Sequence, residues 1–184
     1  LGKLARRATQ RLGRKTGSPD RTGHTIGKNQ IMTTDTGAFD FHRTLPLAPD
    51  QLWHVLTDAN MRERWGAPSA DMILKVEMSD LKVGGIERHI CGPKENPEFE
   101  VETRWYRLDA PSDASFTETI EIGGGAIATS LVTYRLKPRD KGSDLFVHVS
   151  ISSFCGPEAA SEFKDGWNGG LSNLETLVQE LASR

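Results

Sequence analysis

One apolar stripe near the C-terminus constrains this chain more than any other feature of its sequence. From Phe163 onward, large apolar residues recur at steps of three and four, through Trp167, Leu171, Leu174 and Val178. That spacing places them on one face of an α-helix about six turns long. A helix with a single apolar face needs a surface to cover. The stripe therefore predicts a long closing helix, entered at Gly156-Pro157-Glu158 and packed against the rest of the domain.

The sequence before this helix predicts the surface that it covers. In Glu98–Leu108, Phe99, Val101 and Trp105 alternate with charged residues, which is the period of a half-buried strand. Segments of similar length, separated by short turns, predict further strands at 39–45, 71–78, 84–91, 114–122, 126–138 and 143–152. Strands joined by short turns pair antiparallel in sequence order. Two short helices, in APDQLWHVLTD and NMRERW, follow the first strand.

Three glycines interrupt the predicted closing helix. A glycine in a helix interior costs about 1 kcal/mol relative to alanine. Gly170 falls on the apolar stripe, three residues after Trp167, and Gly166 and Gly169 flank it. Glycine lets a backbone approach its neighbours closely and leaves room that a larger side chain would fill. The pattern favours either an open volume beneath the helix or tight packing of the helix on the sheet.

Composition and charge limit the class of protein. The 184 residues, 36% of them hydrophobic, suffice for one globular domain with a core. No apolar run is long enough to cross a bilayer, so membrane insertion is not expected. The two cysteines do not form a disulfide framework, and we expect them reduced, in a cytoplasmic protein.

The net charge of −2 hides an uneven distribution. Residues 1–31 contain eight Lys and Arg and one acid, so the remainder carries −9. An acidic body disfavours nucleic acid as a partner. We expect residues 1–36 to be a basic, disordered extension and residues 37–184 to form the domain.

The order of elements and several motifs resemble a known family. The matching segments are APDQLWHVLTDANMRERW, DLKVGGIERHICGP, APSDASFTETIE, SLVTYRL and FCGPEAASEFKDGWNGGLSNLETLVQEL. They resemble the bacterial branch of the activator-of-heat-shock-protein-90-ATPase-like family, in the SRPBCC (START-like, polyketide cyclase) superfamily. The resemblance implies an α+β helix-grip fold. In that fold a curved antiparallel sheet of about six to seven strands wraps a long C-terminal helix, and two short helices follow the first strand.

The resemblance also implies an elongated cavity between the sheet and the long helix. The superfamily includes carriers of apolar ligands, cyclases, hydrolase-like enzymes and sequestering proteins, so the fold implies a pocket without fixing a reaction.

The first candidate site lies on the expected strand 84–91. Because side chains alternate along a strand, Glu87, His89 and Cys91 share one face. In the family pattern these positions are mostly apolar or aromatic and point into the cavity. Glu118 departs from the pattern in the same way, since the family tends to place an aromatic residue there, beside Phe116.

Three interpretations of Glu87, His89 and Glu118 stay open. In the first, they lie at the rim of the sheet, because one β-bulge would exchange the two faces of the strand. In the second, they anchor the polar end of an apolar ligand. In the third, His89 titrates near neutral pH and works with a glutamate in acid–base catalysis. The catalytic candidates are thus His89, Glu118 and Glu87, with no nucleophile motif beside them. Glu87, His89 and Cys91 fit no common zinc pattern, and we expect no metal and no cofactor.

Aromatic residues supply the expected walls of the cavity, with simple core packing as the alternative. Trp105, Phe163 and Trp167 are the better wall candidates, because the resemblance puts the cavity between that strand and that helix. The predicted ligand-binding set is Glu87, His89, Phe99, Val101, Trp105, Phe116, Glu118, Tyr134, Phe163, Trp167 and Gly170.

The sequence therefore predicts a domain that binds a hydrophobic or aromatic small molecule as a carrier, sequestering protein or sensor. One alternative is an enzyme of polyketide cyclase, dehydratase or hydrolase type that uses the same cavity. A second alternative is an interaction module associated with chaperones. An exposed sheet edge or face would also allow a homodimer.

Overall fold

The computed structural model describes residues 34–156 and 158–184. Of the expected basic extension, residues 1–36, only residues 34–36 are among these described residues. Asp35 and Thr36 belong to the first strand. The elements are β1 (Asp35–Leu45), α2 (Pro49–Thr57), α3 (Ala59–Trp65), β2 (Met72–Ser79), β3 (Ile86–Pro93), β4 (Phe99–Asp109), β5 (Asp113–Ile122), β6 (Gly125–Arg139), β7 (Gly142–Ser153) and α4 (Ala159–Ala182).

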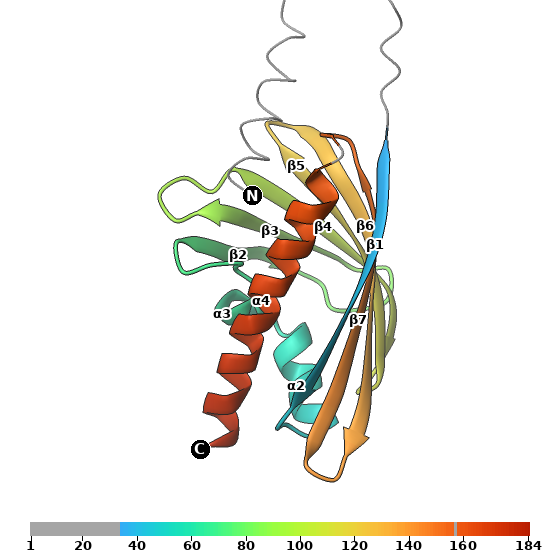
Figure 1. Ribbon diagram of the computed structural model, residues 1–184, viewed down its shortest axis with the longest axis vertical. Helices are drawn as coiled ribbons and strands as arrows, with labels where there is room; N and C mark the ends of the chain where they lie inside the picture. Colours follow the sequence, from blue (N-terminus) through green and yellow to red (C-terminus); the bar gives the residue numbers. More distant parts are fainter. Residues whose placement is uncertain (1–33, 157) are drawn as a thin grey trace, which may run out of the picture.

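The seven strands form one antiparallel sheet in the order β1-β7-β6-β5-β4-β3-β2. Strands β2 to β7 follow one another in sequence order, and β1 pairs along its whole length with β7. The sheet curves around α4, which crosses its concave side, while α2 and α3 lie beside the lower half of α4 (Figure 1). This arrangement confirms the predicted helix-grip fold with two short helices after the first strand.

The predicted periodicities explain which side chains are buried. In β4, Phe99, Val101, Thr103 and Trp105 are buried and the residues between them are exposed. The stripe on α4 faces the sheet, with Phe163, Leu171, Leu174 and Val178 buried in the core. The apolar face of the strands, with period two, and the apolar face of the helix, with period 3.6, thus pack against each other in one interface. Of the helices in the described ranges, none is both long and apolar enough to span a membrane.

The glycines of α4 allow a close approach to the segment that joins α3 to β2, rather than to the sheet. A Cβ atom at Gly169 would lie 2.2 Å from the carbonyl oxygen of Pro68, so the two backbones are in direct contact there. A Cβ at Gly170 would lie 3.4 Å from the carbonyl oxygen of Gly66, which is an ordinary contact. The side chain of Asn173 donates a hydrogen bond to this same joining segment. The tight-packing interpretation is therefore modified, because the tight packing involves Gly169 and its partner is a loop.

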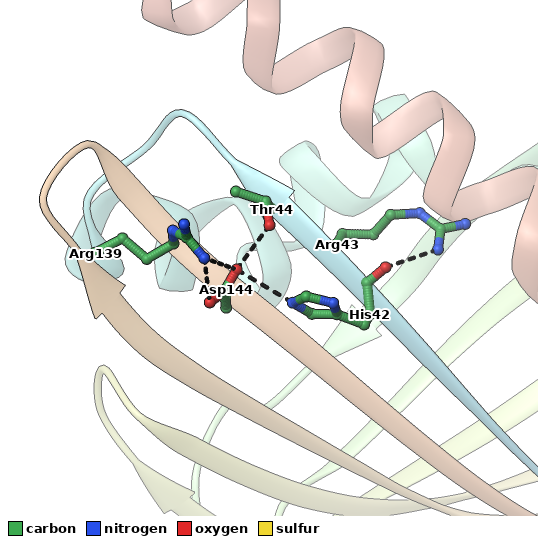
Figure 2. A network of polar contacts seen from close by, with 5 residues as sticks. All are labelled: His42, Arg43, Thr44, Arg139 and Asp144. Carbon is green, nitrogen blue, oxygen red and sulfur yellow. Dashed lines mark hydrogen bonds and ion pairs between the residues drawn. The ribbon is translucent and has the colours of Figure 1, made fainter.

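Asp144 on β7 gathers polar contacts along the β1 edge of the sheet (Figure 2). Its carboxylate accepts a hydrogen bond from Thr44 at 2.7 Å and pairs with Arg139 at 2.9 Å and with His42 at 3.1 Å. The hydrogen bond from Thr44, with help from Arg139 and His42, lowers the pKa of Asp144 to about 2. The β1–β7 pairing is therefore reinforced by side chains as well as by its backbone ladder.

Arg43, which lies between His42 and Thr44 on β1, connects the sheet to the closing helix. Its guanidinium points toward α4 (Figure 2). Its Nε atom lies 2.7 Å from the carboxylate of Glu175, and its Nη2 atom donates to the side chain of Asn168 at 2.8 Å. An arginine on the inward phase of β1 is satisfied because both partners project from α4.

The paired glycines give a direct test of this packing. We expect Gly169→Ala to lower the free energy of unfolding by about 1–3 kcal/mol, because the new methyl group would overlap the Pro68 carbonyl. Gly170→Ala has room for its methyl group and gains up to about 1 kcal/mol of helix propensity. Urea unfolding of both variants beside the wild type measures the difference. Equal effects of the two substitutions would contradict the contact at Gly169.

Candidate functional site

A cavity of about 120 Å³ lies between α3, the concave face of strands β3 to β6, and α4. Its wall is mostly apolar, with a few ionisable groups among aromatic and aliphatic side chains. The sequence-predicted residues that line it are His89, Phe99, Val101, Glu118, Tyr134, Phe163, Trp167 and Gly170. The cavity thus lies where the resemblance implies, beneath the glycine-containing part of α4.

Three predicted residues do not line the cavity, because neighbouring side chains cover them. Trp105 and Phe116 are fully buried, with ring centroids 4.7 Å apart, and belong to the filled core next to the cavity. Glu87 is also fully buried and lies under the guanidinium of Arg62. The alternation of strand residues placed all three on the correct face but did not show what lies above them.

Arg62, on α3, is the most consequential lining residue that the sequence pattern did not predict. It is buried, lines the cavity, and forms an ion pair and hydrogen bond with Glu87. Its guanidinium also lies 6.0 Å from the ring centroid of Trp105. A local signal for it exists, since Arg62 is three residues before Trp65 and so shares the buried face of the same short helix. Other unpredicted lining residues are Trp65, Gly66, Pro68, Leu74, Cys91, Ile120 and Gly166.

Local contacts fix α3, and with it Arg62, in place. The side chain of Asp58 caps the helix by accepting a hydrogen bond from the backbone N–H of Met61 at 3.0 Å. At the other end, the indole N–H of Trp65 donates to the carbonyl of Val55 on α2 at 2.9 Å. The helix therefore holds Arg62 over the sheet as a positioned group, which reduces the entropy lost when it pairs with Glu87.

Glu87 belongs to a row of polar residues that crosses the concave face. Glu87 on β3 lies opposite Thr103 on β4, Thr103 lies opposite Glu118 on β5, and Glu118 lies opposite Ser130 on β6. Directly opposed residues have Cβ atoms about 5 Å apart, so these four side chains form one polar row. The row on one side of it is apolar, with Trp105, Phe116 and Val132, and the row on the other side is apolar from β4 to β6, with Val101, Ile120 and Ala128, but begins at His89 on β3.

Glu87 is the best satisfied member of this row. One of its oxygens pairs with Arg62, and the other accepts a hydrogen bond from Ser79 on β2 at 2.9 Å. The hydroxyl of Thr103, in contrast, is buried and has no hydrogen-bond partner. The row therefore contains a hydroxyl group without a hydrogen-bond partner next to the ion pair of Glu87 with Arg62.

His89 lines the cavity as a neutral imidazole. Its Nδ1 atom is 3.9 Å from the nearest oxygen of Glu87, too far for a hydrogen bond, and is buried without a partner. Burial, and then the positive charge of Arg62, lower the pKa of His89 to about 3. The expectation that His89 titrates near neutral pH is therefore wrong, because burial disfavours the imidazolium and the nearby charge of Arg62 opposes it.

Glu118 is the ionisable group of the cavity that is poised near neutral pH. Burial, opposed by the charge of Arg62 and assisted by the charge of Glu87, raises its pKa to about 7. Burial also raises the pKa of the Cys91 thiol to about 11 and raises the pKa of Tyr134. At pH 7 the cavity thus contains a fixed ion pair, neutral imidazole, thiol and phenol groups, and one carboxyl that is readily ionised.

No group of three or more His, Cys, Asp and Glu in residues 34–156 and 158–184 is arranged to hold a metal ion. Cys91 lines the cavity as a free thiol, while Glu87 is engaged by Arg62. These residues lie on one face of β3 but do not converge on a common point.

Fold and cavity together define a helix-grip protein of the START-like class. A model of the family described as Activator of Hsp90 ATPase homolog 1-like protein matches residues 46–179, and the chain belongs to this family. The fold generally binds hydrophobic ligands. Among curated proteins, no sequence matches the chain.

Solved structures of bacterial proteins share the fold. A protein of Rhizobium loti is 24% identical, with a TM-score of 0.67 over 78% of this chain and 98% of its own. A protein of Chromobacterium violaceum is 21% identical, with a TM-score of 0.64 over 77% and 97%. One from Arthrobacter aurescens is 16% identical, with a TM-score of 0.68 over 82% and 93%. At these identities the likeness establishes the fold.

The pKa of Glu118 predicts a pH-dependent stability. Between pH 4.5 and about 7 the folded protein keeps a proton that the unfolded chain has lost, so ionisation lowers stability as the pH rises. At about 1.4 kcal/mol for each pKa unit, the loss is about 3 kcal/mol by pH 8. Glu118→Gln removes this titration, and we expect the variant to gain that amount relative to wild type between pH 4.5 and pH 8. Urea unfolding of both proteins at the two pH values measures it.

His89 titrates in both proteins and cancels from this comparison. A stability difference between wild type and Glu118→Gln that stays constant with pH would contradict the raised pKa.

The Arg62–Glu87 pair predicts a strong non-additive effect. Arg62→Met leaves Glu87 buried without its cation, which we expect to cost about 3–5 kcal/mol of unfolding free energy. The double variant Arg62→Met/Glu87→Gln should recover most of this loss, because a neutral amide keeps a partner in Ser79. Denaturant unfolding of the two single variants and the double variant completes the cycle. Additive losses would show that the pair is not coupled.

Proposed function

We propose that this protein binds a small hydrophobic or aromatic molecule in the cavity between the sheet and α4. The observation that carries the proposal is an apolar, aromatic-lined cavity that also contains a few polar groups. The Nδ1 atom of His89 faces it without a hydrogen-bond partner, and Glu118 and Tyr134 add a carboxyl and a phenol to the same wall. Ligand sites commonly combine an apolar wall with a few polar groups that orient the ligand.

The size of the cavity limits the ligand. Its volume of about 120 Å³ is below the range of about 300–1,000 Å³ that is usual for drug-sized ligands. A cavity of about 150 Å³ holds a single benzene ring. We therefore propose a ligand with one aromatic ring, or an aliphatic group of similar size, as the part that enters the cavity.

Catalysis is a second candidate function, and the state of Glu118 favours it. A general acid or base works best with a pKa near the working pH, and Glu118 is the cavity group with a pKa of about 7. In this version Glu118 alone would transfer the proton, and His89 would orient the substrate as a neutral hydrogen-bonding group. A rate that depends on a group with a pKa near 7, and that is lost in Glu118→Gln, distinguishes an enzyme from a carrier.

The site would operate in a reducing compartment such as the cytoplasm. Cys91 lines the cavity as a free thiol and Cys155 is buried and unpaired. A thiol in the wall of the site would be open to oxidation elsewhere.

Filling the cavity tests the binding function. Gly170 lines the cavity on α4 and can accept a Cβ atom, so Gly170→Leu would place a side chain into the space. We expect saturable binding of a solvatochromic dye and of toluene by the wild type. We expect Gly170→Leu to lose at least tenfold in affinity, because the leucine side chain would occupy the space of the ligand. A tenfold loss corresponds to about 1.4 kcal/mol of binding free energy.

Gln179→Leu, at an exposed position of the same helix, is the matched control and should bind as the wild type does. Native mass spectrometry of the purified protein would show a ligand that co-purifies. Absence of saturable binding in the wild type, with no co-purifying ligand, would refute the proposal.

A further inference from the structure

We propose that the ligand is a small arylalkylamine, with its amino group on an aliphatic carbon beside one aromatic ring, bound as its cation with the ammonium group against Glu118. This inference rests on the proposed function and names the chemical class of its ligand. Two features carry it, an uncompensated carboxyl group in the cavity and the aromatic rings around that group.

The balance of charge in the cavity favours a cation. Arg62 from α3 is the positive group of the lining, and Glu87 of β3 already neutralises it. His89 and Cys91 of β3 and Tyr134 of β6 also face the site, and the positions of α4 that line it carry no ionisable group. The carboxyl of Glu118 is thus the one acidic group of the described lining without a cation of its own. A ligand that brings a positive charge would supply it.

The walls suit an organic cation. The lining includes the rings of Trp65, Phe99, Tyr134, Phe163 and Trp167. The rings of Tyr134 and Trp167 are nearly perpendicular, at 79°, with centroids 6.3 Å apart, so they form a corner rather than a stacked pair. Aromatic faces attract ammonium groups, most strongly where water is excluded. The same rings pack against an aromatic group of the ligand.

Two hydroxyl groups of the polar row lie next to Glu118, although neither Thr103 nor Ser130 lines the cavity itself. Thr103 lies directly opposite Glu118, and its buried hydroxyl has no hydrogen-bond partner. Ser130 lies opposite Glu118 on the other side. An ammonium group has three N–H donors, and the row presents a carboxylate with hydroxyl groups on both sides of it.

An anionic or a neutral ligand uses this arrangement less well. A ligand carboxylate would face Glu118 and Glu87, while the one nearby cation is already paired. A neutral ligand would leave the ionised form of Glu118 without a cation. The site therefore discriminates by charge among molecules of the same shape.

Binding of a cation is linked to the ionisation of Glu118. Near pH 6 the carboxyl is largely protonated and must lose its proton before it can pair with an ammonium group. Near pH 8 it is already ionised, while an aliphatic amine of this kind is still protonated. The affinity for the amine is therefore expected to rise about tenfold from pH 6 to pH 8, with release of a proton at the lower pH.

Three probes of one shape test the inference by isothermal titration calorimetry: benzylamine, benzyl alcohol and benzoate. At pH 8 we expect the wild type to bind benzylamine about tenfold or more tightly than benzyl alcohol, and benzoate most weakly. From pH 6 to pH 8 the affinity for benzylamine should rise about tenfold, while that for benzyl alcohol stays level. Titrations of the wild type at pH 6 in two buffers of different ionisation enthalpy should detect the released proton.

The variant Glu118→Gln should bring the ratio of the benzylamine and benzyl alcohol affinities close to one. Glu121→Gln removes the same charge from the outward face of the same strand and should leave that ratio unchanged. If benzyl alcohol binds as tightly as benzylamine, or if the preference survives in Glu118→Gln, the inference is wrong although the binding function stands. If none of the probes binds, the proposed function fails and the inference with it.

Discussion

The buried pair between Arg62 and Glu87 is the interaction on which the rest of the site depends. It joins α3 to β3 across 25 positions of the sequence and lies where the helix meets the concave face. Because α3 leads directly into the segment at Gly66 and Pro68, the position of α3 also sets the surface that Gly169 of α4 contacts. The ion pair thus helps to position both α3 on the sheet and the segment after α3 that α4 contacts.

The polar row across the concave face is costly for stability. Buried polar groups without partners destabilise a fold by about 1–3 kcal/mol each, and Thr103 in the row and His89 in the neighbouring row each contain such an atom. Apolar residues on the flanking rows show that this sheet packs well with hydrophobic side chains. Polar residues that lower stability at a cavity are typical of functional sites, where binding compensates for groups that the fold leaves unsatisfied.

Burial sets the protonation states of the cavity, and Arg62 modifies them. Arg62 stabilises the charge of Glu87, opposes protonation of His89, and partly offsets the burial of Glu118. The histidine that attracts attention in the sequence is therefore inert as an acid near neutral pH, and the neighbouring glutamate takes the titrating role. Both the binding and the catalytic version of the function place Glu118 at the centre.

The sequence by itself determined the strands, the closing helix and the inward faces of β3, β4 and β5, because period two and period 3.6 are local properties of the chain, and the resemblance of its motifs to a known family implied the helix-grip fold. Those periods placed Glu87, His89 and Glu118 on the concave face without any knowledge of their neighbours. Only the tertiary structure decided that Glu87 lies under Arg62, that Trp105 and Phe116 fill the core beside the cavity, and that Gly169 meets a loop. Each of these facts depends on residues distant in sequence that come together after the elements pack, and a local pattern carries no information about such partners.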